Sequence, residues 1–112
     1  MAYDEGLANR VRKALSGHKV EEKKMFGGLC FMVNGKMCVT VGKDRLMCRI
    51  DPALHETALA KKGVKTVVMR GREYSGYVHV PEESLTSQRD FDYWINLALD
   101  YNTIAKSTKG RD

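Results

Sequence analysis

The sequence lacks the long apolar runs and leader segments that mark membrane and secreted proteins. No apolar stretch approaches the roughly 20 residues that a membrane-spanning helix needs. The first five residues have neither the basic start nor the apolar core of a signal peptide. We therefore expect a cytoplasmic protein that makes no membrane contact.

Cysteine is scarce, and no recognised metal or redox motif is present. The 3 cysteines form no CxxC pair, which argues against a secreted disulfide framework and against a structural zinc site. The histidines His18, His55 and His79 are isolated, without HExxH or other paired-ligand spacing. The sequence therefore assigns no catalytic, cofactor-binding or metal-binding residue, and we expect a non-enzymatic protein without a cofactor.

Positive charge is in excess, but no nucleic-acid motif accompanies it. The formal net charge is +5 and the pI is about 9.2. Such a balance permits contact with nucleic acid, yet evenly spread basic residues are more often a solvated surface. No helix-turn-helix is present, and Gly27-Gly28 lacks the Lys-Ser/Thr that would follow it in a phosphate-binding loop.

Apolar periodicity and capping residues predict three helices. The first begins after Asp4 and ends at Ser16-Gly17, and the second runs from Pro52 to about Lys62. The third begins after Ser87 and fades from about Asn102. Their predicted buried stripes are Leu7, Val11 and Leu15 in the first, Leu54, Ala58 and Leu59 in the second, and Phe91, Trp94, Ile95, Ala98 and Leu99 in the third.

Five strands are predicted, and the first two form a hairpin. Asn34-Gly35 is typical of a type I′ turn between two apolar runs within residues 24–41. Three further strands are predicted at residues 45–50, 64–69 and 74–80, while residues 18–24 are expected to be a charged connector. The predicted order is helix, three strands, helix, two strands, helix. This is an α+β domain whose antiparallel sheet is covered by helices on one face.

A two-residue turn fixes the expected register of the hairpin, with Met32 opposite Met37 and Phe31 opposite Cys38. One face should then be the helix-covered core, made of Cys30, Met32, Met37, Val39 and Val41. The other, mixed face should carry Leu29, Phe31, Val33, Lys36, Cys38 and Thr40.

The open face of the sheet is the candidate functional surface. Methionine, tyrosine and arginine are favoured at protein interfaces, whereas aromatic residues among basic ones can also bind single-stranded nucleic acid. A half-solvated sheet face without a binding role is the alternative. Cys38 is the one cysteine predicted to merit a test of reactivity, because Cys30 and Cys48 are expected in the core. The candidate surface consists of Phe31, Val33, Cys38, Arg45, Met47, Arg49, Tyr77 and His79.

Three stretches together resemble the N-terminal domain of the TfoX/Sxy family: residues 1–7, the segment 24–28 with its hairpin, and Gly76-Tyr77. The resemblance implies a secretion-chaperone-like α+β fold, and it brings no catalytic residues or cofactor with it. It also implies a stand-alone single domain, at residues 1–105. Because the apolar pattern fades from about Asn102, residues 106–112 are expected to be a frayed basic tail. The most specific part, the family signature, is Lys24, Met25, Phe26, Gly27 and Gly28.

Three functional hypotheses follow. The first is a non-enzymatic regulatory module that contacts a protein partner or a second copy of itself. The second is a regulator that binds DNA directly, suggested by two basic clusters. The third is a small enzyme whose site is assembled from Cys38, His79 and Arg49. The basic clusters are Arg10, Arg12 and Lys13, and Lys23 and Lys24.

Overall fold

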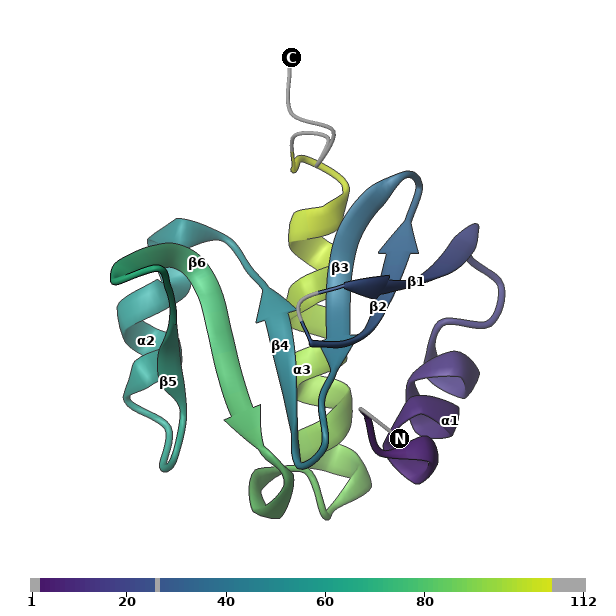
Figure 1. Cartoon of the computed structure of the whole chain (residues 1–112), viewed down its shortest axis with the longest axis horizontal. Coiled ribbons are helices and arrows are strands. Elements are labelled where there is room, and N and C mark those ends of the chain that lie inside the picture. Colours follow the sequence, from purple (N-terminus) through teal and green to yellow (C-terminus); the bar gives the residue numbers. More distant parts are fainter. Residues whose placement is uncertain (1–2, 26, 106–112) are drawn as a thin grey trace.

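A computed structural model describes residues 3–25 and 27–105. Six antiparallel strands form one sheet in the order β1-β2-β3-β4-β6-β5, together with three α-helices (Figure 1). The α+β class and the antiparallel sheet are therefore confirmed. The predicted tail at residues 106–112 lies outside the described residues, as does Phe26 of the signature. The elements are α1 (Glu5–Ala14), β1 (Val20–Met25), β2 (Gly28–Val33), β3 (Lys36–Val41), β4 (Arg45–Arg49), η1 (Pro52–Leu54), α2 (His55–Leu59), β5 (Lys65–Met69), β6 (Arg72–Pro81), η2 (Glu82–Ser84) and α3 (Gln88–Asn102).

The predicted helix caps are confirmed at α1 and α3. The carboxylate of Asp4 accepts a hydrogen bond from the backbone N–H of Leu7 at 3.0 Å. The hydroxyl of Ser87 accepts one from the N–H of Asp90, also at 3.0 Å. Both caps pair a backbone donor that the first helical turn leaves free, so local sequence chemistry sets where these helices begin.

The second helix is shorter than predicted. Asp51 caps the 3₁₀ turn η1 through the N–H of Ala53, and α2 then spans only His55–Leu59. Leu54 is 40% exposed instead of buried, because it belongs to η1 and precedes the helix. Ala58 is buried as predicted.

The predicted connector is an edge strand. β1 pairs antiparallel with β2 along its whole length, so the expectation of a connector at residues 18–24 was wrong. The four central side chains of β1, residues 21–24, are charged and exposed. An exposed edge strand carries such charges because they discourage pairing with other chains, and this pattern conceals a strand from hydrophobic periodicity.

The hairpin turn is confirmed, but the register changes beyond it. Asn34 and Gly35 have φ of 54° and 79°, and Met32 pairs with Met37 as predicted. The register then shifts, so that Phe31 pairs with Val39 instead of Cys38. β3 has one additional residue here, which is a β-bulge. Beyond the bulge, the side chains of β3 share a face with Phe31 where the predicted register put them with Cys30, and the reverse.

The residues of the hairpin are divided between the two faces of the sheet differently from the prediction. The helix-side core takes Leu29, Phe31 and Val33 of β2 together with residues 38, 39 and 41 of β3. Cys30, Met32 and Met37 were wrongly predicted for this core, since they lie in a separate cluster on the other face. Val39 and Val41 are in the helix-side core as predicted.

All three α-helices contribute side chains to the helix-side core. Figure 1 shows α3 running behind the middle strands, with α1 beside β1 and β2 and α2 beside β5 and β6. The core includes Val11 of α1, Ala58 of α2 and Trp94 of α3. Across residues 3–25 and 27–105, no helix has the length and apolar character needed to cross a membrane.

Candidate functional site on the uncovered sheet face

The sheet face opposite the helices, called here the uncovered face, holds five of the eight predicted surface residues. β4 and β6 place them side by side, because Met47 pairs with His79 and Arg49 pairs with Tyr77. Strand alternation sends the intervening Leu46 and Cys48 of β4 to the helix-side core, as predicted. The five residues are Arg45, Met47, Arg49, Tyr77 and His79.

The other three predicted surface residues are corrected to core positions. Phe31 is 0% exposed, and Val33 and Cys38 are each 1% exposed. The three side chains share one side of the hairpin, as the expected register had it, but the helices cover this side and not the opposite one. These residues therefore cannot form part of a surface in the folded chain.

Burial also removes the cysteines as reactive groups. Desolvation, with a smaller contribution from nearby Cys30, raises the pKa of Cys38 to about 12. Burial likewise raises the pKa of Cys30 and of Cys48. All three are buried and free of disulfide bonds. A thiol that stays protonated and shielded is a poor nucleophile, so Cys38 does not have the properties of a reactive cysteine.

A methionine-rich cluster lies beneath the uncovered face. Its members are buried although, in the described part of the chain, no helix packs over them, because side chains from neighbouring strands pack on one another. Unbranched methionine side chains adapt readily to the shape of a contacting surface. The buried members are Cys30, Met32, Met37, Met47 and Val67, and the partly buried Met25, Met69 and Tyr77 pack against them.

Arginine and tyrosine side chains gather at one end of this face. The guanidinium carbon of Arg49 lies 5.7 Å from the ring centroid of Tyr77 and 5.7 Å from that of Tyr101 on α3. Tyr74 and Tyr77 meet edge to face, with centroids 6.0 Å apart. Cation–π contacts of this kind hold Arg49 between the uncovered face and the end of α3.

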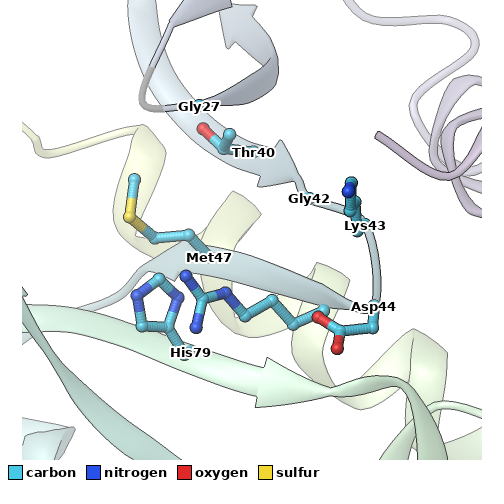
Figure 2. A pocket seen from close by; sticks show the side chains of 8 residues that line it. Gly27, Thr40, Gly42, Lys43, Asp44, Met47 and His79 are labelled. Carbon is cyan, nitrogen blue, oxygen red and sulfur yellow. The ribbon is translucent and has the colours of Figure 1, made fainter. Parts of the chain in front are cut away.

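A hollow of about 480 Å³ lies at the other end of the face, beside the loop that joins β3 and β4 (Figure 2). A second hollow of about 530 Å³ adjoins it and shares Asp44, Arg45 and His79. The sequence predicted Arg45, Met47 and His79 for this region but not the remaining lining residues, since a hollow arises only when distant segments meet. The first hollow is lined by Gly27, Thr40, Gly42, Lys43, Asp44, Arg45, Met47 and His79.

Two lining residues have buried polar atoms without a hydrogen-bond partner among the described residues, namely Thr40 Oγ1 and His79 Nδ1. Burial lowers the pKa of His79, and the positive charge of Arg45 lowers it further. The hollow thus presents a neutral imidazole and a hydroxyl beside the cationic side chains of Lys43 and Arg45.

The structure does not bring together the three residues of the enzyme hypothesis. Cys38 lies in the helix-side core, whereas His79 lies on the uncovered face. Among residues 3–25 and 27–105 there is also no group of three or more His, Cys, Asp or Glu side chains that could hold a metal ion. The structure therefore does not place Cys38 and His79 as a thiol–imidazole pair.

Two of the basic residues that suggested DNA binding have intramolecular partners. Arg12 donates to both carboxylate oxygens of Glu22, at 2.7 and 2.9 Å. Arg10 donates to the carbonyl of Leu85 at 2.8 Å and lies 4.2 Å from the ring centroid of Phe91. These contacts direct both guanidinium groups toward their own chain.

The fold and the site define a small α+β domain with one helix-covered and one uncovered sheet face. The family model described as the TfoX N-terminal domain matches residues 13–101. The chain belongs to the TfoX N-terminal domain family, which is a regulatory type of domain and not a known enzyme family. Comparison with curated proteins and with solved structures gave no significant match.

Proposed function

We propose that this chain is a regulatory interaction module that binds an acidic segment of a partner protein on the uncovered face. The observation that carries the proposal is the row of Arg45, Met47 and Arg49 on β4 beside Tyr77 and His79 on β6. Arginine, tyrosine and methionine are the residue types enriched in protein interfaces. They are gathered here on the face that lacks a helix in the described part of the chain.

Shape and chemistry support a protein partner. The methionine-rich cluster under the face provides apolar surface that can adapt to a partner side chain. Tyr77, which is half-buried, offers a large amphipathic ring of the kind that anchors interfaces.

Charge supports an acidic partner. The two adjoining hollows are lined by three cations, Lys43, Arg45 and Lys65, and by two carboxylates, Asp44 and Glu83. Arg49 adds a further positive charge to the same face. Charge complementarity therefore favours a partner segment that carries Asp or Glu side chains.

The experiment uses a photo-crosslinking amino acid in place of Arg45 and, as a matched control, in place of Arg89, an exposed residue of α3 on the other side of the sheet. Proteins of the native extract that crosslink at position 45 and not at 89 are then purified and tested for direct binding. We expect binding that weakens as salt is added, because it depends on opposite charges.

Charge reversal separates the proposed surface from the rest of the molecule. Replacing Arg45 and Lys65 by Glu should weaken binding of the purified partner by about tenfold or more, since like charges then face each other. Replacing Lys13 and Arg89 by Glu changes the net charge equally and should leave binding intact. Equal effects of both double variants, or crosslinking of the chain only to itself, would contradict the proposal.

Direct DNA binding is the second candidate. Lys13, Lys23 and Lys24 are exposed, but the intramolecular contacts of Arg10 and Arg12 leave this surface with fewer groups for phosphates. Titration of labelled duplex DNA at low salt tests it, since electrostatic binding falls steeply as salt rises. Binding that survives the Arg45 and Lys65 reversals but not Lys23→Glu with Lys24→Glu would favour DNA over a protein partner.

A further inference from the structure

Two unpaired polar atoms belong to the lining of a single hollow. Thr40 and His79 come from strands that are not neighbours in the sheet, yet both line the 480 Å³ hollow. Neither Thr40 Oγ1 nor His79 Nδ1 has a hydrogen-bond partner within residues 3–25 and 27–105. Buried polar groups are nearly always paired, so two exceptions in one place indicate a site that a ligand or ordered water completes.

The thiol on the neighbouring strand is a poor substitute for such a ligand. Cys30 lies directly across from Thr40 in the β2–β3 register. Burial raises the pKa of Cys30, and contact with the Thr40 hydroxyl lowers it by a smaller amount, but sulfur is a weak donor and a weak acceptor. A weak contact with a thiol leaves the Thr40 hydroxyl able to donate to a stronger acceptor.

The charges around the hollow favour an anion. Arg45 lies close enough to His79 to lower the pKa of the imidazole, and Lys43 adds a second cation from the loop. Among the described residues that line the hollow, Asp44 is the one carboxylate. Figure 2 shows Asp44 and Lys43 at the loop end, with Thr40, Met47 and His79 toward the opposite end.

We propose that this hollow binds a small organic oxyanion, a carboxylate or a phosphate ester. The Thr40 hydroxyl and the His79 imidazole donate hydrogen bonds to the anionic group, and Arg45 and Lys43 neutralise its charge. Met47 provides an apolar wall for the carbon part of the ligand. Gly27 and Gly42 admit it closely, because a residue without a side chain leaves the backbone accessible.

The volume of the hollow suits this class of ligand. A space of about 480 Å³ falls within the range of small-molecule sites and is far too small for a folded partner. The site shares Arg45, Met47 and His79 with the protein-binding surface proposed above, but it takes a small anion and needs no protein partner. It also gives the signature residue Gly27 a place in a binding site.

The test uses the purified chain with inorganic phosphate and with succinate as probes, at ionic strength matched with sodium chloride. We expect one of the two to raise the unfolding temperature saturably, as a ligand that binds only the folded state must. The same anion should shift the ring NMR signals of His79 and leave those of the exposed His18 unchanged. The anion that saturates at the lower concentration identifies the class as phosphate or carboxylate.

Two variants locate the binding. Thr40→Val keeps the side-chain shape and removes the hydroxyl, and Arg45→Gln removes a cation from an exposed position. Each substitution should raise the apparent Kd for the anion by about tenfold. Arg72→Gln, an exposed control on β6, should leave this Kd unchanged.

Three results would overturn the proposal. Neither anion has a saturable effect on the unfolding temperature, both variants bind the anion as tightly as the unsubstituted chain, or Arg72→Gln loses as much affinity as the two variants. If Thr40→Val does not fold, Arg45→Gln decides the question, because its exposed side chain lies outside both buried clusters.

Discussion

The imidazole Nδ1 of His55 accepts a hydrogen bond from the backbone N–H of Gly76, with 2.9 Å between the two nitrogen atoms. The other ring nitrogen, Nε2, lies 3.0 Å from the hydroxyl oxygen of Thr66. Because Nδ1 is the acceptor, we place the ring proton on Nε2, where it is donated to Thr66. His55 thereby joins α2 to both β5 and β6 at the irregularity of the β5–β6 pairing.

Replacing His55 by Ala should destabilise the fold by about 1–3 kcal/mol, because the buried N–H of Gly76 then has no acceptor. The free energy of unfolding from urea titration measures the effect. His18→Ala removes an exposed histidine and should change this free energy by less than about 0.5 kcal/mol. Equal stabilities of the two variants would show that the hydrogen bond is not structural.

The features of the fold that depend on local chemistry were predictable. Asp4 and Ser87 cap the helices because a short polar side chain can reach a free N–H three residues on. Asn34-Gly35 forms the hairpin turn because both residues tolerate positive φ. Such signals lie within a few residues of one another, and no tertiary contact is needed to interpret them.

The features that depend on packing were not predictable. The bulge at Cys38 allows the Asn34-Gly35 turn to form while Val39 and Val41 pack under the helices. No local sequence pattern indicates that a bulge occurs at this position. Phe31, Val33 and Cys38 were wrongly assigned to the surface because the helices cover their side of the hairpin and not the opposite one. The part of the candidate site on β4 and β6 was predictable because these strands alternate without a bulge between Arg45 and Arg49.

The two signature glycines should differ sharply in their response to alanine. A Cβ on Gly28 would lie 2.1 Å from the carbonyl oxygen of Val41, so the strand backbone itself would have to move. A Cβ on Gly27 would meet no atom within 4 Å, but the φ of 74° costs an L-residue roughly 1–2 kcal/mol. We expect Gly28→Ala to prevent folding and Gly27→Ala to give a folded, modestly destabilised protein. Circular dichroism with urea titration distinguishes the two, and similar behaviour would contradict the close approach of β2 to Val41.

The side chain of Asn102, at the end of α3, should contribute measurably to the free energy of unfolding. Its side-chain N–H donates to the carbonyl of Val33 at 3.1 Å, and the residue is only 3% exposed. Asn102→Ala removes this hydrogen bond and should cost about 0.5–1.5 kcal/mol in the free energy of unfolding. The neighbouring exposed Thr103→Ala is the control and should cost less than about 0.5 kcal/mol. A loss no larger than that of the control would show that the hairpin does not need this tether.

The cysteines should resist thiol reagents until the chain unfolds. Each is at most 1% exposed, and burial raises the pKa of Cys38 to about 12, so little thiolate exists near neutral pH. Labelling with a chromogenic disulfide reagent should therefore be slow in the native protein and should reach 3 thiols per chain in denaturant. Rapid uptake of one equivalent by the native protein would show that one of these positions opens.

Acidification should destabilise the fold through His79. Its pKa in the folded chain is lowered from 6.5, first by burial and then by the charge of Arg45, so the unfolded chain binds this proton more readily. Stability rises with pH wherever the unfolded state holds more protons, and the contribution of His79 is therefore complete above pH 6.5 and lost as the pH falls below it. Urea titrations from about pH 5 to about pH 8, in chloride buffers free of phosphate and carboxylates, measure the dependence. His79→Gln removes the titrating group and should flatten the curve below pH 6.5 relative to the unsubstituted chain, while Arg45→Gln should flatten it only in part. A curve that is unchanged in His79→Gln would assign the acid sensitivity to other groups and would place His79 in a more solvated environment than the hollow provides.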